Sequence, residues 1–165
     1  MAQLAPVCCA GARWGLCVNA ARVLIVDDHP ATVELTKFVL DAAGFVVEST
    51  TDASHAMLLI AAFRPDLILM DIQMPGIDGL ELTRRLKAEP SMRHIVVVAF
   101  TAFAMKGDEA RMRAAGCDGY IAKPFDVASF AATVRACMHP RSAGSDGPAS
   151  GRATIGRCVN ADASG

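Results

Sequence analysis

The chain has 165 residues, a length that fits one domain, and 16 Lys and Arg against 17 Asp and Glu give a formal net charge of −1. A charge this close to zero gives no electrostatic support for non-specific binding to nucleic acids or anionic membranes. Hydrophobic residues make up 53% of the chain, which is enough for a buried core and excludes disorder along the whole length.

Composition divides the chain into three segments. Residues 1–20 show no hydrophobic periodicity, and we expect a disordered or poorly ordered N-terminal extension. Residues 21–139 alternate apolar runs with amphipathic stretches, and we expect them to form the folded domain. Residues 140–165 open with Pro140 and are rich in Gly, Ser and Ala, which predicts a flexible tail.

The middle segment predicts five strands that alternate with five helices. Short apolar runs rich in branched residues predict buried strands, and apolar residues spaced three and four apart predict helices. The expected strands are Arg22–Asp27, Phe45–Glu48, Asp66–Asp71, Ile95–Phe100 and Tyr120–Ala122. The expected helices run from Pro30 to just before Gly44, from Ala53 to Phe63, from Asp78 to about Lys87, from Lys106 to Ala115 and from Val127 to Met138.

Two of these helices show an apolar stripe that we predict to face the core. The stripe of the first helix consists of Leu35, Phe38, Val39 and Ala42. The stripe of the last helix consists of Val127, Phe130, Ala131, Val134 and Met138.

Repeated strand–helix units of this length predict a parallel sheet covered by helices on both faces. Right-handed crossovers limit the possible topologies. We expect a flavodoxin-like α/β three-layer sandwich with strand order 2-1-3-4-5. In such sheets ligands bind at the carboxyl ends of the strands, near the point between the first and third strands where the strand order reverses.

Charged and polar side chains stand at four of these strand ends. The first strand ends in Asp27 and Asp28, the third in Asp71 and the fourth in Thr101, and Lys123 follows the fifth. Three carboxylates close together repel one another, and Mg²⁺ is the natural compensating ion because it prefers oxygen ligands. A carboxylate beside Mg²⁺ and an ammonium group can attack a phosphoryl group.

Each of these residues also has a purely structural interpretation. Asp28 and Thr101 can cap the helices that follow them, Asp71 can cap the turn around Pro75, and Lys123 can be solvated. The conjunction of acids, hydroxyl and lysine at the ligand-binding edge outweighs these separate interpretations.

With these residues, the chain resembles the receiver domain of the response regulators of two-component signalling, the CheY-like superfamily. The resemblance covers residues 22–139. It is carried by VLIVDDHP, PDLILMDIQMPGIDGLEL, VVVAFTA and AAGCDGYIAKPF. The sequence VAFTAFAMKGDEARMRAAGCDGYIAKP is similar to the corresponding part of stand-alone DivK-type receivers.

The resemblance implies a phosphoacceptor and a metal site. Asp71 would accept a phosphoryl group from a histidine kinase or a histidine phosphotransfer protein. Asp28, Asp71 and the backbone carbonyl of Gln73 would bind Mg²⁺ directly, and Asp27 would act mainly through water.

The resemblance also implies a conformational switch. Lys123 would contact the phosphoryl group, and its peptide bond to Pro124 is expected to be cis. Thr101 would move towards the phosphoryl group, and Tyr120 would turn inward in the active state. The surface that changes would comprise the fourth helix, the fifth strand and the fifth helix, roughly residues 104–138.

The expected function is that of a single-domain response regulator that signals through contacts with a downstream protein target. We expect self-catalysed phosphorylation and dephosphorylation but no turnover enzyme, and a monomer or weak dimer with no direct binding to nucleic acid or membrane. Two features depart from the family. Phe100 is bulkier than the residue usual before the switch threonine, which predicts altered packing beneath the switch, and the extension before Ala21 is unusual.

Three alternatives remain open. A receiver-like module could bind its partners without phosphorylation, but none of the expected site residues is lost. The chain could be a receiver fragment of a hybrid histidine kinase. An enzyme on a similar sheet fits the sequence less well. A phosphatase with an aspartyl nucleophile usually has a DxD pattern after the first strand, whereas here Asp28 is followed by His29-Pro30. A flavin site would need a phosphate-binding loop after the same strand, where this chain has acidic residues.

The sequence gives limited information about location and redox state. Apolar runs are interrupted by charge before the roughly 18 residues of a transmembrane helix, and the only charge in residues 1–21 is Arg13. We therefore expect a cytoplasmic protein. The six cysteines form no CxxC pair, so we expect free thiols, with a zinc site as the alternative.

Overall fold

The computed structural model describes residues 20–102 and 107–138, which form five strands and five helices. The expected flexible tail, and all but Ala20 of the expected extension, lie outside the described residues. The strands are β1 (Arg22–Val26), β2 (Val46–Thr50), β3 (Leu67–Asp71), β4 (Val96–Thr101) and β5 (Gly119–Ala122). The helices are α1 (Pro30–Ala42), α2 (Ala53–Phe63), α3 (Gly79–Ala88), α4 (Asp108–Ala115) and α5 (Val127–Met138).

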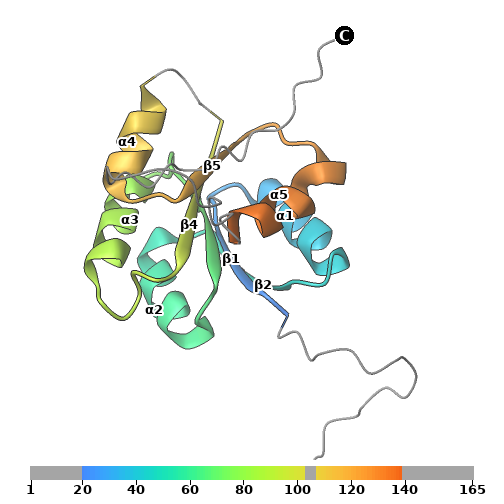
Figure 1. Cartoon of the computed structure of the whole chain (residues 1–165), viewed down its shortest axis with the longest axis horizontal. Coiled ribbons are helices and arrows are strands. Elements are labelled where there is room, and N and C mark those ends of the chain that lie inside the picture. Colours follow the sequence, from blue (N-terminus) through green and yellow to red (C-terminus); the bar gives the residue numbers. More distant parts are fainter. Residues whose placement is uncertain (1–19, 103–106, 139–165) are drawn as a thin grey trace, which may run out of the picture.

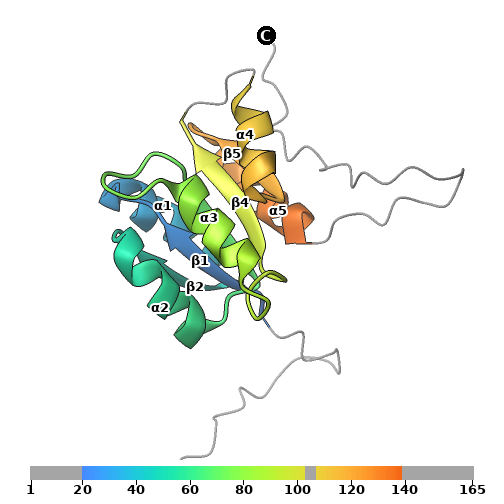
Figure 2. The same ribbon diagram turned by 90° about the vertical axis from the view of Figure 1, so that its left-hand side faces the viewer.

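The five strands form one parallel sheet in the order β2-β1-β3-β4-β5, which confirms the predicted topology. Helices α1 and α5 cover one face of the sheet, and α2, α3 and α4 cover the other (Figure 1). The second view shows α2, α3 and α4 in front of the strands (Figure 2). The architecture is therefore the three-layer sandwich expected from the sequence.

Both faces of the sheet are buried at its centre, because alternate residues of the central strands enter different cores. Val23 and Ile25 of β1 belong to the core under α1 and α5, whereas Leu24 and Val26 belong to the core under α2, α3 and α4. All four side chains are fully buried. This burial explains why β1, β3 and β4 are continuous apolar runs rather than alternating ones.

Helix ends follow local sequence signals. Pro30 begins α1, where its missing N–H has no intrahelical partner to lose. Gly44 follows the end of α1 with φ +86°, a conformation that favours glycine. Asp52 and Asp78 cap α2 and α3 by accepting bonds from the backbone N–H groups of Ser54 and Leu80.

The prediction of the core-facing side of α1 was wrong. Its buried residues are Val33, Thr36 and Leu40, and Phe38 is 73% exposed. Leu35 is also exposed. The predicted stripe is therefore mostly an apolar surface of α1 that faces solvent.

Smaller differences occur elsewhere. Val127 at the start of α5 is exposed, whereas Phe130 and Val134 are buried as predicted. The expectation of free thiols holds for the buried Cys117 but is wrong for Cys137, which is disulfide-bonded. Within residues 20–102 and 107–138, no helix is long and apolar enough to cross a membrane.

Candidate functional site

The candidate site lies where the carboxyl ends of the central strands meet. Val26 of β1 pairs with Met70 of β3, so Asp27 and Asp71 follow at the same level of the sheet. Asp71 in turn pairs with Phe100 of β4. Parallel pairing therefore brings residues 44 positions apart to one edge, as predicted.

Lys123 bridges the two central carboxylates from the loop after β5. Its Nζ donates to Asp27 Oδ2 at 2.5 Å and to Asp71 Oδ2 at 3.1 Å. The Asp27 side chain is fully buried and that of Asp71 nearly so, and the lysine is itself mostly buried. The peptide bond between Lys123 and Pro124 is cis, as the family resemblance implied.

The acidic residues form a group with the composition of a cation site. Each of Asp27, Asp28, His29 and Asp71 offers one ligand atom, and these atoms lie within 4.8 Å of one another. Three carboxylates face one lysine ammonium here, which leaves excess negative charge for a divalent cation to neutralise. The oxygen-rich donor set fits Mg²⁺, and the Asp28 side chain is partly exposed, so an ion can enter from solvent.

His29 is the residue that sequence reasoning missed. Its backbone N–H donates to Asp27 Oδ1 at 2.9 Å, and its Nδ1 lies 2.9 Å from Asp28 Oδ1. The only signal in the sequence was its place directly after the acid pair. The side chain itself is largely exposed.

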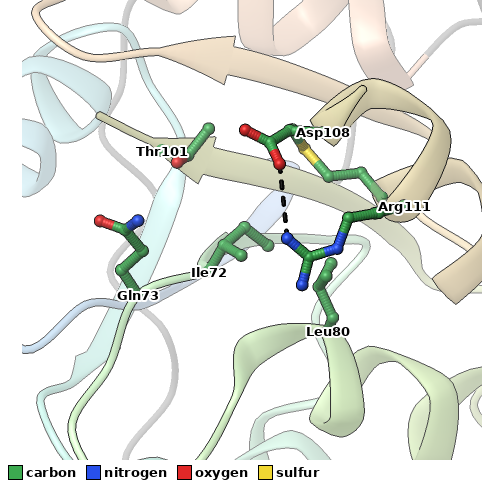
Figure 3. Close-up of a pocket in the computed structure, with 7 residues that line it drawn as sticks. Ile72, Gln73, Leu80, Thr101, Asp108 and Arg111 are labelled. Atoms are coloured by element: carbon green, nitrogen blue, oxygen red, sulfur yellow. Dashed lines mark hydrogen bonds and ion pairs between the residues drawn. The ribbon is translucent and has the colours of Figure 1, made fainter. Parts of the chain in front are cut away.

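Gln73 follows β3 and Thr101 ends β4, at the edge of the sheet where the carboxylates lie. The Gln73 backbone N–H donates to Asp71 Oδ1 at 2.9 Å, so both oxygens of Asp71 accept a hydrogen bond. Thr101 is buried at the end of β4. A pocket extends from these two residues to α4, where Asp108 and Arg111 form an ion pair (Figure 3).

Two further residues define the surroundings of the site. Tyr120 of β5 is half-buried and packs against the core under α2, α3 and α4. Gly79 begins α3 directly against β3. A Cβ at this position would stand 2.1 Å from the backbone oxygen of Asp71, so only glycine permits this close approach.

Phe100 faces a different core from its neighbour in β4. It belongs to the core under α1 and α5, whereas the preceding Ala99 belongs to the core under α2, α3 and α4. Adjacent strand residues point to opposite faces of a sheet. The altered packing beneath Thr101 that the bulk of Phe100 predicts stays a prediction.

Residues 23–135 match the response regulator receiver domain family. The chain belongs to this family. The receiver is a signalling domain of two-component systems rather than an enzyme in the usual sense. Its acidic group is compatible with Mg²⁺ binding and phosphorylation.

Relatives support the same assignment. The receiver is 46% identical over 116 residues to the polar-differentiation response regulator DivK of Brucella anthropi, covering 70% of this chain and 94% of that one. It resembles the structure of the chemotaxis response regulator CheY4 of Vibrio cholerae (TM-score 0.68, 24% identity, 72% and 99% covered). It also resembles a receiver domain of a signal transduction histidine kinase from Syntrophus aciditrophicus (TM-score 0.66, 31% identity, 79% and 98% covered).

Proposed function

We propose that this receiver is a DivK-like, single-domain response regulator that accepts a phosphoryl group on Asp71. The donor is a histidine kinase or a histidine phosphotransfer protein. The observation that carries the proposal is the Lys123 ammonium, which bonds both Asp27 and Asp71 at the edge of an otherwise acidic group. A cytoplasmic location is part of this proposal.

The contacts of Asp71 with Lys123 and Gln73 support its role as the group that attacks phosphorus. An Asp71 oxygen forms the new O–P bond while the bond from phosphorus to the donor's histidine nitrogen breaks. The Lys123 ammonium stabilises negative charge on the phosphoryl oxygens. The Gln73 N–H holds one carboxylate oxygen and fixes the orientation of the side chain.

Asp28, Asp71 and the Gln73 carbonyl would hold Mg²⁺, with Asp27 acting mainly through water. The ion supplies charge neutralisation at the phosphoryl oxygens. Without it, the carboxylates would repel an incoming phosphoryl group.

The output is a change in protein contacts on the surface of α4, β5 and α5. The Thr101 hydroxyl bonds a phosphoryl oxygen, and Tyr120 turns inward, which shifts an existing conformational equilibrium. The pocket between Thr101 and α4 provides space for this movement. A downstream protein then binds this surface with altered affinity, and the receiver acts as a monomer or weak dimer.

The test is the intact mass of the protein after incubation with Mg²⁺ and acetyl phosphate. One added phosphoryl group is expected. It should be absent in Asp71→Ala and in the presence of EDTA. Asp66→Asn, at the other end of β3, is the matched control and should retain the adduct.

The opposite result would be a folded protein that binds Mg²⁺ but gains no mass. That outcome would favour a module that binds its partners without phosphorylation. An adduct that persists in Asp71→Ala would assign the acceptor to another residue.

A further inference from the structure

The residue before the switch threonine contacts the lysine of the site. Lys123 Nζ lies 4.6 Å from the centroid of the Phe100 ring. An ammonium within about 6 Å of a ring centroid is attracted by the negative face of the ring. Phe100 of β4 pairs with Asp71 of β3, so its side chain leaves the backbone next to the proposed phosphoacceptor.

We propose that Phe100 is a positioning residue for Lys123 and holds the Lys123 ammonium where it bonds Asp27 and Asp71. The expected effect on phosphoryl transfer rests on the proposed function. The contact between Lys123 and the Phe100 ring does not depend on that function. The lysine stem is flexible, and ordering it costs conformational entropy. Contacts with the ring and with two carboxylates together restrict the position of the ammonium.

The Phe100 ring is itself held firmly. It is fully buried and contacts two other rings, with centroids 5.4 Å away in Phe125 and 5.7 Å away in Phe130. Both distances lie in the range preferred by aromatic pairs. Burial therefore leaves the Phe100 ring little freedom to move, and among the described rings it is the one that lies against the Lys123 ammonium.

Burial makes the contact more effective. The Lys123 side chain is only 16% exposed, and Asp27 beside it is fully buried. Attraction between a cation and a ring is stronger where water is excluded. An aliphatic residue at position 100 would fill space but provide no negative ring face.

The matched pair of variants is Phe100→Leu and Phe130→Leu. Both remove one fully buried ring from the same core, but among the described residues only Phe100 lies against a lysine ammonium. Phe100→Met replaces Phe100→Leu if the latter does not fold, as checked by circular dichroism. Urea unfolding shows whether the two losses of stability are comparable.

The first measurement is the side-chain NMR signal of Lys123, assigned with Lys123→Arg. The ring should shift the Cε proton signals of Lys123 upfield in the wild type and in Phe130→Leu, and this shift should be lost in Phe100→Leu. An unchanged shift in Phe100→Leu would overturn the proposal. This measurement needs no phosphorylation, so it stands even if the proposed function fails.

The second measurement is the rate of phosphorylation by acetyl phosphate with saturating Mg²⁺. Loss of the cation–ring attraction should slow Phe100→Leu by about 2- to 30-fold. Phe130→Leu should stay within about twofold of the wild type. Equal slowing of both variants would assign Phe100 a packing role only. A wild type that takes up no phosphoryl group would refute the proposed function and leave the NMR result to decide the positioning role.

Discussion

Lys123 Nζ lies 2.5 Å from Asp27 Oδ2, a contact between residues 96 positions apart and the shorter of the two ion pairs of this lysine. Asp27 is fully buried. A buried carboxylate needs a compensating charge, and here the lysine supplies it. The same ammonium opposes any cation that binds the neighbouring acids.

Lys123→Met should therefore strengthen Mg²⁺ binding, because the variant removes a competing positive charge from the site. An effect of about 1 kcal/mol corresponds to roughly fivefold tighter binding. The variant should also be less stable by about 3 kcal/mol without Mg²⁺, since Asp27 is left unpaired. Isothermal titration and urea unfolding measure the two effects.

Lys87→Met is the control for this experiment. Lys87 forms an ion pair with Asp118. Asp118 accepts a bond from the Val97 N–H at the start of β4, whereas the acidic group lies at the opposite ends of the strands. Its removal should leave Mg²⁺ affinity unchanged. Weaker Mg²⁺ binding in Lys123→Met would show that the lysine organises the ligands rather than competing with the ion.

Phe38 and Leu40 offer a direct test of how α1 lies on the sheet. Phe38 is 73% exposed, whereas Leu40 is fully buried in the core under α1 and α5. Leu40→Ala should lower the free energy of unfolding by about 3 kcal/mol, and Phe38→Ala should change it by less than about 0.5 kcal/mol. Urea titration followed by circular dichroism measures both. A larger loss for Phe38→Ala would mean that α1 is rotated or that its outer surface is covered in solution.

The same helix shows the limit of prediction from sequence. The true core side contains Thr36 between Val33 and Leu40, so its apolar signal is weaker than that of the outer stripe with Leu35 and Phe38. A helix with two apolar sides gives no periodicity that distinguishes them. Which side packs on the sheet is decided by the tertiary structure.

The sheet and the central charged group were predictable for a different reason. Strands buried on both faces are continuous apolar runs, and parallel order fixes which strand ends meet. From that rule we predicted that Asp27, Asp71 and Lys123 lie close together, as the structure shows. It could not place the His29 side chain or the Phe100 ring, because strand order does not determine how a side chain turns after the strand or what packs beneath it.

Cys117 is predicted to be an unreactive thiol. Burial raises its pKa to about 11, so almost none of it is thiolate at pH 8. Iodoacetamide at pH 8 should leave Cys117 unmodified in the folded protein and modify it in urea, as followed by peptide mass spectrometry. Rapid labelling without urea would show that the segment between α4 and β5 opens readily.

The Asp52 carboxylate should make the stability of α2 depend on pH. Hydrogen bonds from Ser54 hold the pKa of Asp52 below its usual value of 3.8, and His55 adds a smaller effect in the same direction. Because the folded pKa is lowered, this stabilisation is fully present above pH 3.8 and is lost as the pH falls through the folded value.

The measurement compares the thermal unfolding midpoints of the wild type and Asp52→Asn at pH 7, at pH 4.5 and below pH 3. The asparagine keeps an oxygen that can cap α2 but carries no charge. The wild type should be the more stable protein at pH 7 and pH 4.5, and the difference should shrink below pH 3. Asp126→Asn should behave in the same way at α5, because bonds from Ser129 and Ala128 lower the pKa of Asp126. A difference that stays constant across the three pH values would show that the charge of the Asp52 carboxylate contributes nothing to the cap.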